Sequence, residues 1–203
     1  MPGSPDLAAR LAGPVLDVAP RLLGAVLRHD GVAVRLTEVE AYDGEGDPGS
    51  HAVRGRTRRN AVMFGPPAHL YVYFTYGMHH CANVVCGNAG TAAAVLMRAG
   101  EVVEGLDLAR ARRAGAPDRD LARGPARLCR ALGLDLTLDG VDLRTGAVSL
   151  ELPGRPVPRP EISTGPRVGL RLAADRPCRF WVTGDTTVSA YRPAVRRLSR
   201  GDS

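Results

Sequence analysis

Lysine is missing from this sequence of 203 residues, so all 27 of its basic residues are arginines. Without lysine, no side-chain amine can form a Schiff base, which excludes that class of covalent catalysis for the side chains. Arginine stays charged and its planar fork suits two-point contacts with phosphate. The net charge of +6 is therefore compatible with a polyanionic partner, although a basic protein without such a partner fits the charge equally well.

Long apolar runs, a secretory leader and closely paired cysteines are also missing. The first 20 residues contain prolines and three charged side chains, so they lack the apolar core of a signal peptide. No apolar run is long enough to cross a bilayer. The cysteines show no CxxC spacing: Cys81, Cys86, Cys129 and Cys178. We therefore expect a soluble, cytoplasmic protein with reduced thiols and no membrane partner.

Metal-binding patterns are weak in this chain. His79, His80 and Cys81 stand together with Cys86 close behind, but they lie in an apolar, strand-like run. A second ligand pair at zinc spacing is missing. We predict neither a metal site nor a cofactor.

Hydrophobic periodicity predicts several short strands and few helices. We expect a helix running into a strand over 19–27 and a strand over 32–42, after a hairpin signal at Asp30-Gly31. Further strands are expected over 70–76, 80–85 and 92–98, with Gly77 between the first two, and within 141–152 and 167–183. Helical spacing predicts helices over 103–114 and 124–132, the second with Pro125 in its first turn.

The chain shows no internal repeats and no βαβ alternation, which favours an α+β fold around an antiparallel sheet. The polar residues 43–60 and the Pro/Gly-rich residues 153–166 are expected to form loops. The length suits one domain with a real core. We expect flexible termini over 1–13 and 199–203, and a single domain over 14–198.

Two glutamates stand in the strand predicted over 32–42. Glu38 and Glu40 point to one face of a strand, and Tyr42 lies beyond them on that face. Two carboxylates on a mostly apolar strand are costly unless they are solvated, paired or used. An exposed strand face explains them, and so does a general base beside an aromatic wall.

An arginine-rich loop follows this strand. It contains His51 and four arginines, with Thr57 among them: Arg54, Arg56, Arg58 and Arg59. Such a loop is a natural surface for phosphate contacts, but a solvated charge cluster has the same composition.

Tyrosines gather in the segment LYVYFTYGM. Tyr71 and Tyr73 share a strand face, whereas Tyr76, beside Gly77 and Met78, is expected at a hairpin tip. An aromatic side chain at a tip can enter a base stack, and inward aromatics can sandwich an extruded base. Ordinary core packing accounts for any one of these tyrosines equally well.

Taken together, these segments resemble one family closely. The chain resembles the alkyladenine (3-methyladenine) DNA glycosylases, which are monofunctional purine glycosylases. The resemblance spans residues 16–193 in the family's order and rests on EVEAY, HxxxGxTxRNxxMF, LYVYFTYGMxxCxN, VLMRA, GPARLCRALG, PRVG and RPCRFWV. It implies a curved, barrel-like antiparallel sheet with flanking helices and a protruding hairpin that intercalates into DNA.

The resemblance also implies roles for individual residues. Glu40 would activate water for attack at the sugar C1′ carbon, Arg98 would help to hold that water, and the backbone carbonyl of Val168 would be a further ligand. The base pocket would consist of Tyr42, His51, Tyr73 and Asn83, with Asn83 disfavouring the 2-amino group of guanine. The DNA contacts would come from Arg54, Arg56, Thr57, Arg59, Tyr76 and Met78, with Tyr76 filling the gap in the duplex.

The implied activity is base-excision repair of duplex DNA. A damaged purine of the 3-methyladenine, 7-methylguanine, hypoxanthine and ethenoadenine class would be flipped out and its N-glycosidic bond hydrolysed. Because lysine is missing, we expect no lyase activity; the secondary amine of Pro2, exposed if Met1 is removed, lies in the terminal segment expected to be flexible. We expect a monomer in the bacterial cytoplasm, near the nucleoid, without an obligate protein partner.

The chain departs from the family at Gly100 and Val102, where a bulkier residue and a proline are usual, and at His79 and His80, where aromatics are common. Two other functions stay open: a non-catalytic nucleic-acid-binding module with a structural Glu40, and a small-molecule enzyme on a related barrel-like fold. Steep salt dependence of binding would disfavour the second.

Overall fold

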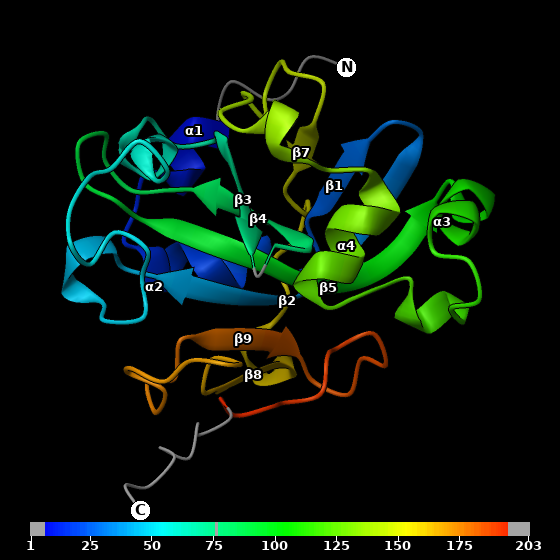
Figure 1. Cartoon of the computed structure of the whole chain (residues 1–203). Coiled ribbons are helices and arrows are strands. Elements are labelled where there is room, and N and C mark those ends of the chain that lie inside the picture. Colours follow the sequence, from blue (N-terminus) through cyan, green and yellow to red (C-terminus); the bar gives the residue numbers. More distant parts are fainter. Residues whose placement is uncertain (1–6, 76, 195–203) are drawn as a thin grey trace, which may run out of the picture.

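The computed structural model describes residues 7–75 and 77–194 (Figure 1). Its strands are β1 (Val26–His29), β2 (Val32–Tyr42), β3 (Leu70–Thr75), β4 (His79–Val85), β5 (Ala94–Glu104), β6 (Ala122–Arg123), β7 (Ser149–Glu151), β8 (Ile162–Gly165) and β9 (Arg179–Val182). Its α-helices are α1 (Leu7–Leu11), α2 (Val15–Val18), α3 (Leu106–Arg112) and α4 (Pro125–Leu132). The 3-10 helices are η1 (Ala19–Leu22), η2 (Gly44–Gly46), η3 (Ala61–Phe64), η4 (Asp118–Asp120), η5 (Leu136–Leu138) and η6 (Arg159–Glu161). A single α+β domain with a large antiparallel sheet is therefore confirmed.

The sheet is open, so the expected barrel-like closure is wrong. Its main path runs β3-β4-β5-β2-β1-β7, and in the described residues no ladder joins the end strands β3 and β7. Residues 141–143, which belong to no helix or strand, lie along the free edge of β3 instead: the Leu70 N–H donates to the Val141 carbonyl at 2.9 Å. The Leu150 N–H of β7 donates to Leu143 of the same segment at 3.2 Å.

Strand β2 is the centre of the sheet. It pairs with β5 along one edge, while β1 and then β9 share its other edge. The β1–β2 connection confirms the hairpin predicted at Asp30-Gly31: His29 pairs with Val32, and the two turn residues have φ of 42° and 74°. Positive φ at both positions is what a tight two-residue hairpin needs.

The pairing of β2 with β5 is irregular around Glu38. The register shifts between Leu36 and Glu38 and again between Glu38 and Val39, so that Arg98 of β5 has no Cα partner on β2. Gly100 lies beside this irregularity, and a Cβ there would stand 2.4 Å from the Arg35 carbonyl oxygen. The glycine therefore permits a close approach of the two backbones, and bulges of this kind re-aim side chains next to functional sites.

Helix α4 packs on β4 and β5 (Figure 1). Its apolar side is buried through Leu128, Cys129 and Leu132. Pro125 begins the helix and Gly133, with φ of 72°, ends it. Both helices predicted from periodicity are present, with α3 shorter than expected. Within 7–75 and 77–194, no helix combines the length and apolar character needed to span a bilayer.

Two segments differ from the expectations. Residues 153–166, expected to be a loop, contain β8, because Ile162 pairs with Val182 across 20 positions and this long-range partner outweighs the local Pro/Gly signal. Within residues 1–13, expected to be flexible, the described part forms α1, whose Leu7 and Leu11 are buried in the core.

Candidate active site

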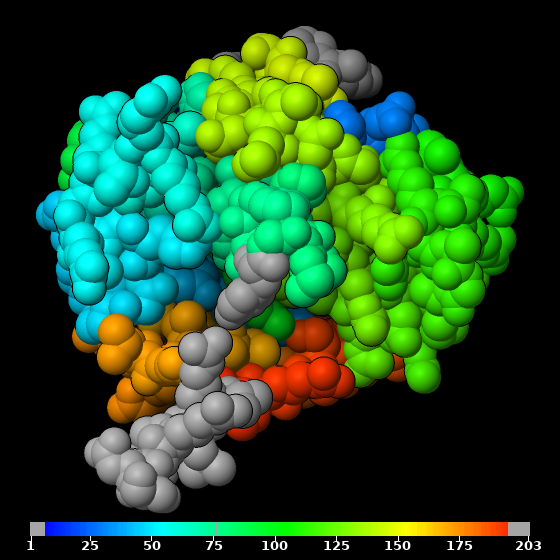
Figure 2. Space-filling model, viewed as in Figure 1, coloured from blue at the N-terminus to red at the C-terminus, as the bar shows by residue number. Residues whose placement is uncertain are grey.

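A cavity of about 340 Å³ lies where β2, β5, the β3–β4 hairpin and the residues after β8 come together. Figure 2 shows the cyan residues after β2, the hairpin in green and the orange segment after β8 meeting on this face. The volume falls within the range of about 300–1,000 Å³ that is usual for small-ligand pockets. The lining includes all seven residues expected to form the catalytic and base-binding sites: Glu40, Tyr42, His51, Tyr73, Asn83, Arg98 and Val168.

Glu40 is fully buried as a residue yet lines the cavity. Its Oε2 accepts the hydroxyl of Tyr42 at 2.8 Å, and its Oε1 accepts the backbone N–H of Val168 at 2.7 Å. Arg98 contributes a longer ion pair, from Nη1 to Oε1 at 3.3 Å. The carboxylate is thus held from three sides.

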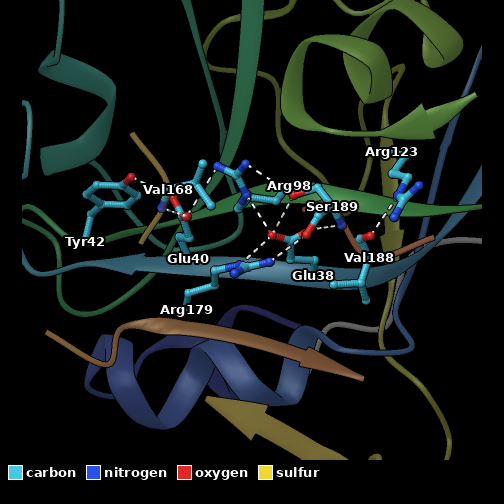
Figure 3. Close-up of polar contacts among 9 residues, drawn as sticks. All are labelled: Glu38, Glu40, Tyr42, Arg98, Arg123, Val168, Arg179, Val188 and Ser189. Carbon is cyan, nitrogen blue, oxygen red and sulfur yellow. Dashed lines mark hydrogen bonds and ion pairs between the residues drawn. The ribbon is translucent and has the colours of Figure 1, made fainter. Parts of the chain in front are cut away.

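Glu38 has no exposed surface and does not line the cavity. Its Oε1 accepts the Nε groups of Arg98, at 2.9 Å, and Arg179, at 2.7 Å (Figure 3). Ser189 donates to both carboxylate oxygens of Glu38, from its backbone N–H to Oε2 at 2.7 Å and from its hydroxyl to Oε1 at 3.0 Å. Four donors therefore compensate the burial of this carboxylate, as a buried charge requires.

A second buried ion pair stands behind Tyr42. Arg167 has no exposed surface, and its guanidinium forms two hydrogen bonds with Asp47, of which Nη2 to Oδ1 measures 2.7 Å. The same guanidinium lies 4.6 Å from the centroid of the Tyr42 ring. Burial and the charge of Glu40 raise the pKa of Tyr42 well above its usual value, so the hydroxyl keeps its proton and donates.

Tyr42 links the two sets of ion pairs, because its ring lies against Arg167 and its hydroxyl donates to Glu40. We call the six ionic residues of the two sets the charged cluster, and they are all the buried charged residues of the described chain: Glu38, Glu40, Asp47, Arg98, Arg167 and Arg179. Three carboxylates face three arginines, so the formal charges cancel. Burial lowers the pKa of Arg98, but Glu40 and Glu38 outweigh that effect and raise it overall. The guanidinium at the cavity therefore stays charged.

Another part of the cavity lining is an aromatic wall, formed by His51, Tyr71 and Tyr73. His51 stands edge-on to Tyr73 with ring centroids 4.4 Å apart, and its Nδ1 lies 3.2 Å from the Tyr71 hydroxyl. Burial, and then the charge of Arg59, lower the pKa of His51, so the imidazole is neutral near neutral pH. Burial also raises the pKa of Tyr71 to about 12 and that of Tyr73 further. The wall therefore carries no charge.

Asn83 belongs to β4, directly across from Tyr71. Its side-chain nitrogen donates to the Tyr71 carbonyl at 3.1 Å, which fixes the orientation of a buried amide that lines the cavity. A fixed amide beside a planar ligand can discriminate between purine edges.

His51 of the arginine-rich loop lines the cavity, whereas Thr57 and the four arginines of the loop do not. Arg54, Arg56 and Arg59 are exposed. Thr57 and Asn60 brace the loop: the Thr57 N–H donates to the Asn60 side chain at 2.6 Å. Arg59 donates to the Phe74 carbonyl at 3.1 Å, which ties the loop to β3.

The hairpin tip is described only in part. Tyr76, expected to fill the gap in the duplex, lies outside the described residues. Met78 is 68% exposed, as a side chain that enters a base stack must be. Groups of three or more His, Cys, Asp or Glu able to hold a metal do not occur in the described residues.

Several residues of the site were not anticipated from the sequence. Arg167 and Arg179 stand in the segments PRVG and RPCRFWV, which carried the resemblance without a role for these arginines. Asp47 and Ser189 gave no signal, because their partners lie 120 and 151 positions away. Val168 was expected to contribute its carbonyl, and the contact found is its N–H to Glu40.

Comparisons with known proteins agree on one family. The model of a family described as methylpurine-DNA glycosylase (MPG) matches residues 9–186. A protein of Streptomyces avermitilis is 57% identical over 198 residues, covering 93% of this chain and 92% of its own. Proteins of Leifsonia xyli and Burkholderia lata are 59% and 50% identical and cover 87% and 89% of this chain, and 88% of their own lengths. All three bear the name "Putative 3-methyladenine DNA glycosylase".

Proposed function

Because the chain belongs to the methylpurine-DNA glycosylase family, we propose that it hydrolyses the N-glycosidic bond of alkylated or deaminated purines flipped out of duplex DNA. The observation that carries this proposal is Glu40: a buried carboxylate, held from three sides, that lines the same cavity as the aromatic wall. A carboxylate in that position suits a general base for water.

In the proposed reaction Glu40 takes a proton from a water molecule, whose oxygen attacks the C1′ carbon of the deoxyribose. The bond between C1′ and the purine nitrogen breaks, and the base leaves with the electron pair. Arg98, 3.3 Å from Glu40, helps to hold the water. The Val168 N–H fixes Glu40 Oε1, and its carbonyl is the proposed further water ligand.

Recognition of the base depends on its charge. A purine methylated at N3 or N7 is cationic, and stacking it against tyrosine adds a cation–π attraction of about 0.5–2 kcal/mol. Tyr42 and Tyr73 supply such rings. His51, neutral because burial and Arg59 lower its pKa, does not repel the cation. Asn83 is proposed to disfavour guanine by meeting its 2-amino group.

The DNA backbone is proposed to contact the exposed arginine-rich loop, through Arg54, Arg56, Thr57 and Arg59. Met78, between β3 and β4, and Tyr76, predicted from the sequence alone to stand near it, would fill the space of the extruded nucleotide. Flipping costs least for weakly paired lesions, which adds selectivity before any cavity contact. A monomer suffices for this task.

The proposed product is an intact abasic site, because the chain has no lysine for a lyase step. Sodium borohydride trapping on lesion-containing duplex tests this directly. We expect no covalent complex and no strand break before alkali. A trapped complex that disappears in a Pro2→Ala variant would show that the N-terminal amine is a nucleophile and would end the monofunctional assignment.

The decisive experiment compares wild type with Glu40→Gln on duplexes that each contain one lesion: 7-methylguanine, hypoxanthine or ethenoadenine. Single-turnover base release, revealed by alkali at the abasic site, should fall by about 100- to 10,000-fold, the usual contribution of a general base. Affinity for an undamaged duplex should stay unchanged. Equal excision by both proteins would remove Glu40 from the mechanism.

The same assay separates the rival functions. Binding without any excision by wild type would favour a non-catalytic module. DNA affinity that ignores salt concentration would favour a small-molecule enzyme, because neutralising several phosphates makes log K fall steeply with log salt.

A further inference from the structure

Glu38 is a buried carboxylate that the proposed reaction does not use. It has no exposed surface, and it does not line the cavity, so it can touch neither water nor base there. Burying a carboxylate costs free energy even when it is paired, and a protein with well-packed apolar residues in place of a buried ion pair is often just as stable. The four hydrogen bonds to Glu38 therefore call for a role beyond stability.

The geometry around Arg98 suggests that role. Arg98 presents Nε to Glu38 at 2.9 Å and only Nη1 to Glu40, at 3.3 Å. A guanidinium prefers to grip one carboxylate with two parallel hydrogen bonds. Because Nε is paired with Glu38 and Nη2 faces the Ser189 hydroxyl at 3.4 Å, Arg98 touches Glu40 through Nη1 alone. The lone pairs of Glu40 are therefore not all taken by a two-point ion pair.

Ser189 completes this arrangement from a distant part of the chain. Its hydroxyl lies 3.0 Å from Glu38 Oε1 and 3.4 Å from Arg98 Nη2, so it touches both partners (Figure 3). Its carbonyl accepts Arg179 Nη2 at 2.8 Å, and its N–H donates to Glu38. The backbone of Ser189 is therefore fixed by Arg179 and Glu38, and its hydroxyl is directed to Glu38 and Arg98.

The segment around Ser189 is itself anchored at several points. Thr187 pairs with the hydroxyl of Thr37 at 2.8 Å, and the Val188 carbonyl accepts Arg123 Nε at 2.8 Å. The Arg192 carbonyl accepts the N–H of Gly169, the residue after Val168, at 3.0 Å. The family match ends at residue 186, so this segment lies beyond the part of the chain that it covers.

We propose that Glu38 and Ser189 are positioning residues for Arg98, which hold its guanidinium in one-point contact with Glu40. Neither residue touches the reacting atoms. Their function is to keep Arg98 beside Glu40 without letting the two close into a two-point ion pair. This inference rests on the proposed role of Glu40 as the general base.

The test uses Glu38→Gln and Ser189→Ala in the full chain, with Ser189→Thr to restore the hydroxyl. Ser163→Ala is the matched control, because Ser163 also forms a hydroxyl hydrogen bond, to Thr183 at 2.8 Å, but on the accessible β8–β9 pair. The substrate is a duplex with one 7-methylguanine, whose base is already cationic. Affinity is measured separately on a duplex with a tetrahydrofuran abasic analogue.

The expected result is a loss of rate without a loss of binding. Glu38→Gln should slow single-turnover excision by about 100-fold, the scale of a 1 Å misplacement. Ser189→Ala should slow it by about 3- to 10-fold, the scale of one hydrogen bond. Ser189→Thr should restore most of the rate, and Ser163→Ala should match wild type. All dissociation constants should stay within about 2-fold, which is far less than the loss of affinity expected from one missing hydrogen bond to a charged group.

The pH–rate profile separates positioning from general damage. The titratable or charged groups that face Glu40 are Arg98 from β5, Tyr42 on β2, and Tyr73 and Cys81 from the hairpin. Burial raises the pKa of the last three, so near neutral pH Arg98 is the charged one. In Glu38→Gln, Arg98 is expected to close on Glu40 in a two-point ion pair, which stabilises the ionised form of the base. The acid limb of the pH–rate profile of this variant should therefore move to lower pH.

Two results would overturn the inference. One is a Glu38→Gln or Ser189→Ala protein that folds and excises at the wild-type rate. The other is a Ser189→Ala loss that Ser189→Thr does not rescue, with an unmoved acid limb in Glu38→Gln. If wild type itself releases no base, the proposed function fails instead, so the two failures can be told apart.

Discussion

The cavity has two sides that are built on different principles. The charged cluster combines three carboxylates and three arginines that are all buried, and it is tied together by hydrogen bonds between residues far apart in sequence. The aromatic wall holds uncharged rings in edge-on and tilted contacts, and beside it the arginine-rich loop is exposed. One side fixes a few atoms, whereas the other offers surface to a planar ligand.

The difference is instructive because the two sides face different requirements. A base and the water it activates must be held closely, and a 1 Å error in such positioning can cost about 100-fold in rate. Stacking on a ring tolerates small displacements, so it suits a range of purines. Changes to the charged cluster should therefore affect stability and rate, and changes to the aromatic wall should affect selectivity and affinity.

The largest expected effect concerns stability. Asp47→Asn leaves Arg167 without its buried counter-charge, which should lower the free energy of unfolding by about 3–5 kcal/mol. Urea unfolding with an unchanged slope measures this. Asp118→Asn is the control: Asp118 and its partner Arg110 are both exposed, and exposed ion pairs contribute little to stability. Equal losses in the two variants would contradict the comparison.

The same ion pair gives a pH dependence with a defined sign. Burial raises the pKa of Asp47, but the hydrogen bond and charge of Arg167 outweigh it, so the pKa is lowered overall. The contribution of Asp47 is therefore fully present above about pH 4, the ordinary aspartate range, and is lost as pH falls through the lowered value. Wild type should approach Asp47→Asn in stability only in that acid range.

The next effect concerns selectivity. Tyr73→Leu keeps an apolar side chain but removes a ring of the aromatic wall, so stacking worth about 1–3 kcal/mol per base should be lost. Excision of cationic 7-methylguanine should suffer more than that of neutral hypoxanthine, by up to about 2 kcal/mol. Tyr191→Leu, an exposed tyrosine outside the cavity lining, should leave both rates unchanged. Identical losses on both lesions would argue against recognition of the cation.

A smaller effect comes from removing one hydroxyl on each side of the cavity. Tyr42→Phe removes the donor 2.8 Å from Glu40, and Tyr71→Phe removes the partner of His51 at 3.2 Å. Losing a hydrogen bond to a charged group should slow single-turnover excision in Tyr42→Phe by about 10-fold or more. Tyr71→Phe should slow excision by less, about 2- to 10-fold, the scale of a neutral hydrogen bond. A reversed order would break the proposed division between the two sides.

The smallest effect is expected at the exposed loop. Arg56→Ala should weaken duplex affinity slightly and reduce the salt slope of log K by about 0.9, the value for one lost phosphate contact. Excision from the bound complex should not change. A titration at several salt concentrations measures this, and an unchanged slope would place Arg56 off the DNA.

Much of the sheet and both main helices could be predicted because their signals are local. Alternation marks residues 32–42, the Asp30-Gly31 pair marks the hairpin, and Pro125 and Gly133 bound α4. The open sheet and β8 could not be predicted this way. Both depend on which distant segments pair, and residues 153–166 carry a local Pro/Gly signal that favours a loop.

The same rule separates the predicted from the unpredicted parts of the site. Glu40, Tyr42 and Tyr73 stand in strands whose alternation and composition drew attention to them, and Glu38 was noticed for the same reason. The paired-carboxylate pattern did not reveal that Glu38 is held by Arg179 and Ser189. Gly100 was noticed only as a departure from the family, and the structure shows that it lets β5 approach the Arg35 backbone closely.

The distance in sequence between Glu38 and Ser189 has a consequence for biosynthesis. The two residues are 151 positions apart, so at about 5–20 residues per second Ser189 is made roughly 8–30 s after Glu38. Until then a growing chain holds both glutamates and Arg98 but lacks the contact that fixes the arginine. We expect a chain in which Ser189 has not yet docked to excise more slowly than the finished enzyme, by at least the roughly 3- to 10-fold loss expected of Ser189→Ala.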